Sequence, residues 1–425
     1  MNDRRHQRVA FARLLSSAVV SQTLLSAASF AVNLMLIRST ADAQYAYFIL
    51  ASNAILLAVS LQNAMFTPPL STRMGQLGAQ ERADLVGGLY RTLRRMLPIA
   101  GTALVLVTLG LWVARVLDVH SGPLMLAAVG ATLVILHREY FRVVLFAHRQ
   151  PGGVLRADAA HVVLVVACVW IATFTPMPAA AGIFSMGVAA LVSGALLSRT
   201  VQRHEPWNRD AAPGGLRRFA PLVVWSTLGA ATHWTFGQGY IYLVAATLDV
   251  SAVAALAATR LLLMPVNLLS SGIGTLMLPV ASGWLHRHDF ALVLRRLCLM
   301  AAGLSVIALV YFAIVWLSRD WIFGVLVKKE FPQRDLLLLL WGGAFFVMVL
   351  RDQLAYLLTA QGRFRVLTLL TLGCAMLSLV VSYAAMQRFG AAGALVGMLV
   401  GELINLLGIV MLALRRSPPL AAAAA

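Results

Sequence analysis

Arginines inside long apolar stretches are the side chains of this sequence best suited to chemistry. Four lie in such stretches, namely Arg138, Arg142, Arg260 and Arg351. A charged side chain at the centre of a membrane helix costs about 2.5–3.5 kcal/mol on insertion scales, so each is expected to face a partner or an aqueous cavity. Guanidinium groups bind phosphate oxygens through two parallel hydrogen bonds. The four arginines therefore favour an anionic binding partner.

Three of these arginines have acidic neighbours in the sequence. Arg138 and Arg142 are four residues apart and share one helix face, and Arg351 holds the corresponding position in the second half of the chain. All three lie toward helix ends. They are predicted either to bind substrate or to reach the membrane interface and pair with Glu139 and Asp352.

Arg260 has a different context, because no acidic residue lies within one helical turn of it. Pro265, Gly272 and Gly274 follow in the same apolar stretch and favour a kink there. An arginine without a local partner on a kinkable helix is predicted to contact substrate at the seam between two lobes.

Acidic and histidine residues in apolar stretches are candidates for coupling transport to an ion. Glu402 follows the GxxxG spacing of 397–401, which predicts close helix packing, so it is either a protonatable site or a hydrogen-bonding group at that contact. Asp158 and His161 lie near the start of a predicted helix. The helix dipole alone could account for the aspartate, or the pair could form a proton site. Asp352 is a further coupling candidate.

The stretch THWTFGQGYIY (232–242) mixes hydrogen-bonding and aromatic side chains. Sugar hydroxyls need polar partners, and sugar rings stack on aromatic rings. Trp234 lies near the middle of a predicted span, too deep for an aromatic belt at the membrane interface. His233, Trp234 and Gln238 are therefore predicted to line a substrate cavity.

Membrane helices must position these residues. The 425 residues are 60% hydrophobic and 12% charged, about half the charged share of soluble domains. Windows of about 20 apolar residues predict twelve spans. They are 14–37, 44–68, 96–117, 122–146, 157–175, 180–198, 219–246, 252–281, 297–317, 336–358, 366–386 and 391–414. The expected fold class is an all-α integral membrane protein with two six-helix lobes.

An internal repeat supports the division into halves. The matching pairs are TLRRM (92–96) with VLRRL (293–297), REYFRVVLFA (138–147) with RDQLAYLLTA (351–360), AAG at 180–182 with AAG at 391–393, and QNAMFTPPLS with GIGTLMLPVAS, where the second and eighth spans both close on a proline. Each half contains an even number of spans, so the halves share one orientation and are expected to be related by an axis along the membrane normal.

A polar segment between the halves completes the predicted organisation. The expected parts are an N-terminal lobe over 1–198, a cytoplasmic linker over 199–218, a C-terminal lobe over 219–416 and a short tail over 417–425. With the N-terminus in the cytoplasm, 23 Lys and Arg residues fall on that side and 7 on the other. This bias predicts that both termini are cytoplasmic.

Several functions are disfavoured. The net charge of +18 is spread over short segments between apolar runs, which argues against nucleic-acid binding. The three cysteines lie in apolar runs, so neither a disulfide framework nor a CxxC metal site is expected. The sequence contains no HExxH, Gly-rich phosphate loop or GxSxG motif, so we expect no enzyme, metal or cofactor.

Some motifs resemble those of a known family. NLMLIRSTADAQYAYFIL (33–50) ends the first span, an arginine next to an acid ends the fourth, and AAG opens the sixth and twelfth. With six plus six helices, essentially the whole chain looks like the polysaccharide flippases of the multidrug/oligosaccharidyl-lipid/polysaccharide exporter (MOP) superfamily. One element departs, because the junction after the first span usually reads Glu-Tyr-Gly and here reads Gln44-Tyr45-Ala46.

The resemblance implies a transporter that flips an undecaprenyl-pyrophosphate-linked oligosaccharide across the bacterial inner membrane by alternating access. Its expected partners are the anionic lipid-linked glycan, membrane lipid, a coupling proton or sodium ion, and proteins of lipopolysaccharide or exopolysaccharide assembly. A cation-coupled small-molecule or drug exporter of the same superfamily is an alternative, although such exporters typically carry acids in the first helix and 14–37 has none. Peptidoglycan-precursor flippases usually have two further helices. A membrane enzyme of glycan assembly usually has a large periplasmic loop, and the largest here is about 318–335.

Overall fold

The chain is helical throughout the part that can be described. A computed structural model describes residues 2–74, 77–113, 121–148, 150–212, 216–287, 290–361 and 363–414. These residues contain no strand, so the predicted all-α fold class is confirmed. The predicted tail over 417–425 lies outside the described residues.

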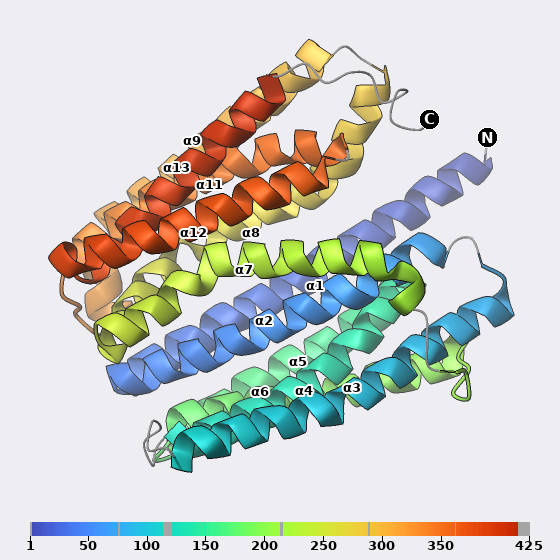
Figure 1. The fold of residues 1–425 in the computed structure, drawn as a ribbon, viewed down its shortest axis with the longest axis horizontal. Helices are drawn as coiled ribbons and strands as arrows, with labels where there is room; N and C mark the ends of the chain where they lie inside the picture. The colour runs from blue at the N-terminus through green and yellow to red at the C-terminus, as the bar shows by residue number, and fades with distance from the viewer. Residues whose placement is uncertain are drawn as a thin grey trace. The chain divides into compact units, whose positions relative to one another are not determined.

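Two compact units divide the chain, Met1–Ala231 and Thr232–Ala425. The first contains α1 (Asn2–Ser39), α2 (Asp42–Arg73), α3 (Ala79–Val113), α4 (Ser121–Ala147), α5 (Pro151–Ala172) and α6 (Pro178–His204), drawn from blue to green in Figure 1. A 3-10 turn, η1 (Leu216–Phe219), then leads into α7 (Ala220–Thr247), which contains the boundary between the units.

The second unit contains the remaining helices. They are α8 (Val250–Arg287), α9 (Phe290–Leu317), the short α10 (Arg319–Trp321), the π-helical η2 (Ile322–Val327), α11 (Arg334–Ala360), α12 (Phe364–Phe389) and α13 (Ala391–Leu414). The organisation into six-helix lobes over 1–198 and 219–416 stays a prediction.

Ten of the described helices are long and apolar enough to cross a membrane. The two long helices not among them, α7 and α11, have 28 and 27 residues, which exceeds the roughly 20 residues that a span requires. The chain is a multi-pass membrane protein.

The largest difference from the predicted spans is in α3, which begins at Ala79 rather than near residue 96. Its first half is amphipathic, with Val86, Leu89 and Leu93 buried at helical spacing and Arg91 between the last two. A search for continuous apolar runs cannot detect such a segment. The predicted end of this span, 114–117, lies outside the described residues.

The segment after α6 is attached to the first unit. The backbone N–H of Asn208 donates to the Ala83 carbonyl on α3 at 3.1 Å, and its side-chain amide donates to Asp84 at 2.5 Å. Arg91 donates to the Arg209 carbonyl at 2.8 Å. We call residues 205–211 the docked segment. A large part of the predicted linker is thus fixed to α3.

Aromatic packing reinforces this attachment. The Trp207 ring stacks on Phe141 of α4 with centroids 5.5 Å apart and lies 5.0 Å from the Tyr90 ring of α3. Phe141 and its neighbour Tyr140 are both buried, and Tyr140 donates to the Val86 carbonyl. Aromatic pairs of this kind contribute about 0.5–1.5 kcal/mol beyond area burial.

Small residues allow the helices that hold the candidate sites to approach closely. A Cβ added to Gly194 of α6 would stand 3.3 Å from Arg138 of α4. A Cβ added to Gly397 of α13 would stand only 2.3 Å from the backbone nitrogen of Ser382 on α12. The close packing predicted from the GxxxG spacing is therefore present between α12 and α13.

Candidate functional site

A buried ionic network connects three helices of the first unit. Arg138 of α4 is 4% exposed. It donates to Asp158 of α5 at 2.5 Å and to the Ser193 hydroxyl of α6 at 3.0 Å, and it forms a further ion pair with Glu139. The close contact of α4 with α6 at Gly194 brings Arg138 within reach of Ser193.

Asp158 is the most buried member of this network, with no exposed surface. It accepts hydrogen bonds from Ser21 of α1 and from Arg138, and at 3.2 Å from Arg142. Because α5 begins at Pro151, Asp158 is the eighth residue of the helix, and the helix-start explanation of this aspartate is wrong. Ion pairing accounts for its burial instead.

The charges of this first-unit network balance. Two arginines, Arg138 and Arg142, face two carboxylates, Glu139 and Asp158. His161 joins at its edge, with Nδ1 3.3 Å from the Ser193 hydroxyl. The structure thus brings together four of the predicted residues and Glu139, but Asp158 contacts arginines and serine rather than His161. Substrate binding and ion coupling by this group stay predictions.

A second ionic network lies in the other unit. Arg351 of α11 donates to Glu402 of α13 at 2.5 Å and to its neighbour Asp352 at 2.7 Å. Its guanidinium also lies 5.7 Å from the centre of the Phe236 ring on α7. Arg351 and Glu402 are 5% and 1% exposed. His233 of α7 lies within electrostatic range of Arg351 and Asp352. One arginine therefore forms ion pairs with two carboxylates.

Arg260 of α8 has neutral partners. Its guanidinium donates to the Gln238 amide oxygen of α7 at 2.6 Å and lies 5.4 Å from the centre of the Trp341 ring on α11. Trp341 is fully buried, donates its ring N–H to the Leu256 carbonyl at 3.2 Å, and packs edge-on to Tyr240. Arg260 is half-buried, and no acidic side chain pairs with it among the described residues.

The three candidates on α7 are divided between different neighbours. Gln238 contacts Arg260, whereas the Trp234 ring lies 5.5 Å from Tyr242 on the same helix. His233 is exposed and Trp234 half-buried. The structure thus links Gln238 to Arg260 but does not gather all three side chains around one point.

Four contact residues were missed in the sequence, namely Ser21, Ser193, Phe236 and Trp341. Single serines in apolar helices are common and carry no pattern. Trp341, an aromatic residue well inside an apolar helix, was the one available signal, since a buried indole N–H needs an acceptor.

Within the described residues, no three His, Cys, Asp or Glu side chains are arranged to hold a metal ion. The networks instead consist of arginine, carboxylate, hydroxyl and amide groups. These groups can bind an anion or exchange a proton.

Solved structures with the same arrangement of helices are transporters, whereas no protein-family model and no curated protein matches the sequence. An inward-facing multidrug resistance MATE family transporter of the MOP superfamily is 12% identical, covers 92% of this chain and 93% of its own, and has a TM-score of 0.76. The eukaryotic MATE transporter AtDTX14 is 11% identical over 96% of both chains, with a TM-score of 0.67.

A third similar structure is a MOP superfamily transporter from Pyrococcus furiosus, for which a binding pocket of reverse polarity suggests a different function. It is 13% identical, covers 95% of this chain and 94% of its own, and has a TM-score of 0.68. Identities this low establish the fold alone. The chain has the fold of the MATE transporters of the MOP superfamily.

Proposed function

We propose that this protein is a membrane transporter that flips an undecaprenyl-pyrophosphate-linked oligosaccharide from the cytoplasmic to the periplasmic leaflet of the bacterial inner membrane. The MATE-like fold supports a transporter that works by alternating access. The resemblance to polysaccharide flippases supports the glycan cargo, and both termini are expected in the cytoplasm.

One observation carries the anionic character of the cargo, the neutral surroundings of Arg260. Arg138, Arg142 and Arg351 each pair with carboxylates, so the protein already compensates their charges. Arg260 has an amide and an aromatic ring as its partners. Since neither carries a negative charge, the guanidinium keeps its capacity to pair with a pyrophosphate. Gln238 and Trp341 hold it in position.

The paired arginines have a different role in this proposal. Arg138, Arg142 and Arg351 connect helices within each unit. A passing anionic group could replace their carboxylates as the partner of the guanidinium. The carboxylates, together with His161, are the candidates for proton or sodium coupling. They are Asp158, Asp352 and Glu402, and each lies beside an arginine whose charge its protonation would uncover.

A cation-coupled exporter of small molecules or drugs is the second candidate. The observation that favours it is the composition of the second network, in which Arg351 faces two carboxylates and leaves an excess of negative charge. Some structurally similar transporters are multidrug resistance proteins. Pocket polarity differs among proteins of this fold, as the P. furiosus transporter indicates.

The cargo can be tested by deleting the gene and extracting lipid-linked intermediates from spheroplasts. Accumulation of complete repeat units on the cytoplasmic leaflet supports the flippase. Unpolymerised units in the periplasm would indicate a polymerase, and unchanged intermediates together with raised drug sensitivity would indicate an exporter.

Complementation with variants tests the role of Arg260. We expect Arg260→Ala to abolish glycan export while insertion into the membrane stays normal, and Arg260→Lys to restore part of it because the charge returns without the planar fork. Arg38→Ala is the matched control, since Arg38 is exposed at the end of α1. Normal export by Arg260→Ala would remove Arg260 from the mechanism.

A further inference from the structure

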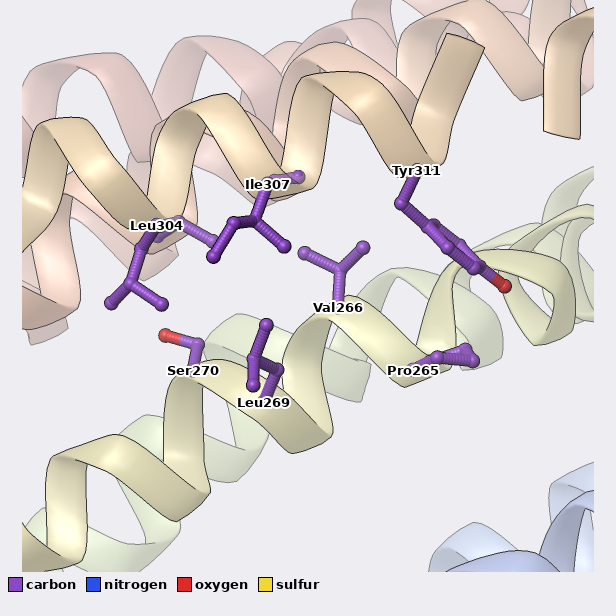
Figure 2. Close-up of a pocket in the computed structure, with 9 residues that line it drawn as sticks. Pro265, Val266, Leu269, Ser270, Leu304, Ile307 and Tyr311 are labelled. Atoms are coloured by element: carbon purple, nitrogen blue, oxygen red, sulfur yellow. The ribbon is translucent and has the colours of Figure 1, made fainter. Parts of the chain in front are cut away.

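An apolar pocket lies between α8 and α9 in the second unit. It has a volume of about 170 Å³. Val266 of α8 and Leu304 and Ile307 of α9 face each other across it, and Val349 of α11 contributes to its wall. Figure 2 shows these α8 and α9 side chains projecting into the space between the two helices.

A proline and a tyrosine lie at one end of the pocket. Pro265 lies inside α8 and has no N–H, so the Leu261 carbonyl one turn earlier loses its helical donor. Tyr311 of α9 donates its hydroxyl to the Leu262 carbonyl at 2.8 Å. This contact ties the helices together at one end of the pocket, where Figure 2 shows Tyr311 opposite Pro265.

The pocket opens onto an exposed apolar surface of α9. Ile307, which lines it, is 52% exposed, and Leu269 on the α8 side is 40% exposed. Val306, Val310 and Ile314 extend the same exposed apolar surface along α9. In a membrane-spanning helix such a surface contacts lipid, so a hydrocarbon chain can enter the pocket sideways from the bilayer.

One buried polar group points into this apolar space. Ser270 is 2% exposed, lines the pocket, and its hydroxyl has no hydrogen-bond partner in the part of the chain that the structure describes. In Figure 2 the Ser270 oxygen points toward Leu304. Gln353, one turn along α11 from Val349, is also fully buried with both amide atoms unpartnered among the described residues. Unpartnered buried polar atoms of this kind need an explanation.

We infer that this pocket binds one isoprene unit of a polyprenyl chain. The inference rests on the proposed function, because it assigns a place to the lipid carrier of the cargo. An apolar protein cavity of about 150 Å³ accepts benzene, so 170 Å³ suits the five carbons of one isoprene unit. Its described lining is uncharged, which excludes the pyrophosphate from the same space.

The unpartnered hydroxyl favours an unsaturated isoprenoid chain over a saturated acyl tail. Each isoprene unit carries a double bond, whose π electrons accept weak hydrogen bonds, whereas a saturated chain accepts none. The Ser270 hydroxyl can therefore donate to the double bond of the bound unit. The pocket is expected to hold the tail while Arg260, ten residues earlier on the same helix, attracts the charged end.

Photolabelling of the full-length protein in vesicles of saturated phosphatidylcholine tests the inference. The probe is a short polyprenyl phosphate with a diazirine at its terminal isoprene unit, compared with its fully saturated analogue. We expect the unsaturated probe to label α8 and α9 around Val266 and Leu304, about tenfold more strongly than the saturated probe. Equal labelling by both probes would overturn the isoprenoid assignment.

Three variants sharpen the test. Ala308→Phe fills the pocket and is expected to remove the label, whereas Val310→Trp adds a comparable ring on the exposed side of α9 and should leave it unchanged. Ser270→Ala makes a smaller change to packing and should abolish the preference for the unsaturated probe. Labelling that survives Ala308→Phe indicates general lipid contact and overturns the inference.

The fate of the lipid-linked intermediates separates this inference from the proposed function. If deletion leaves glycan export intact while the pocket is labelled selectively, the proposed function fails and the isoprenoid site stands. If deletion blocks glycan export and the pocket is not labelled, the site fails and the flippase stands.

Discussion

Arg351 on α11 and Glu402 on α13 form a buried ion pair with nitrogen and oxygen 2.5 Å apart. Glu402 is 1% exposed, and the neighbouring glycines at 397 and 401 let α13 approach α12 closely. The pair therefore joins α11 to a helix that packs tightly against α12. This arrangement makes Glu402 a structural residue as well as a coupling candidate.

Removing one partner of this pair is expected to destabilise the protein. Glu402→Gln leaves Arg351 buried with Asp352 as its remaining acidic contact, and breaking a buried pair in this way costs about 3–5 kcal/mol. The melting temperature in detergent, read by size-exclusion chromatography after heating, should fall. Glu330→Gln, at a side chain 88% exposed, should change nothing.

A double variant distinguishes structure from coupling. If the role of Glu402 is structural, Arg351→Gln with Glu402→Gln should be more stable than Glu402→Gln alone and should export more glycan. A stable double variant that does not transport would instead identify Glu402 or Arg351 as part of the transport cycle.

Asp158 should be the most sensitive position of the first-unit network. Asp158→Asn removes the charge that Arg138 and Arg142 share, and we expect a loss of about 3–5 kcal/mol. Ser21→Ala removes one hydrogen bond to that carboxylate and should cost about 1.5–3 kcal/mol. Thr23→Ala is the control, because Thr23 is exposed and bonds to its own helix. Equal melting temperatures for Ser21→Ala and Thr23→Ala would argue against the network.

The docked segment can be displaced through a single glycine. A Cβ at Gly87 of α3 would lie 1.7 Å from the Asn208 carbonyl oxygen, so Gly87→Ala should push residues 205–211 away from α3. Trypsin should then cleave after Arg209 faster than in the wild type. Gly110→Ala, on the same helix, meets no atom within 4 Å and should leave the cleavage rate unchanged. Unchanged cleavage in both variants would mean that the segment is not held by this contact.

A pH effect is expected where the docked segment meets the end of α4. His148 Nδ1 lies 2.5 Å from Glu205. Burial, and then the charge of Arg82, lowers the pKa of His148, while burial raises the pKa of Glu205. Because the lowered pKa of His148 leaves its imidazole neutral near neutral pH, the contact is a hydrogen bond rather than a full ion pair there.

Protonation of His148 is expected to destabilise the folded protein. Its pKa is lower in the folded state, so its contribution to stability is complete above the ordinary value of about 6.5 and is lost as the pH falls through it. Glu205 acts oppositely, since the cost of burying its charge decreases as the pH falls through its raised pKa.

Melting curves between about pH 8 and 6 check this prediction. The wild-type melting temperature should fall more on acidification than that of His148→Gln, and Glu205→Gln should retain a fall on acidification. Parallel curves for wild type and His148→Gln would contradict it.

The elements that continuous apolar runs define could be predicted from the sequence. The start of α13 at Ala391 and its end at Leu414 match the predicted span 391–414, because both are marked by changes in composition. The first half of α3 could not be found in this way, since charged and small residues separate its buried side chains. Periodicity, rather than mean hydropathy, was the relevant signal there.

In the candidate sites, contacts between residues adjacent in sequence could be predicted, whereas contacts between residues far apart in sequence could not. Arg138 with Glu139 and Arg351 with Asp352 are adjacent in sequence, and their pairing is one of the two roles predicted for these arginines. The contact between Ser21 and Asp158 spans 137 residues and depends on how α1 packs against α5. No local pattern contains that information, and the same holds for the neutral partners of Arg260.

The two ionic networks have different consequences while the chain is being synthesised. Arg138 meets Asp158, its partner on the next helix, after only 20 further residues. Arg351 is synthesised 51 residues before Glu402, so α11 reaches the membrane before α13 does, and Asp352 is the acidic partner that it carries with it. Insertion of α11 should therefore depend on neighbours already present, and assembly of the second unit should finish only when α13 arrives.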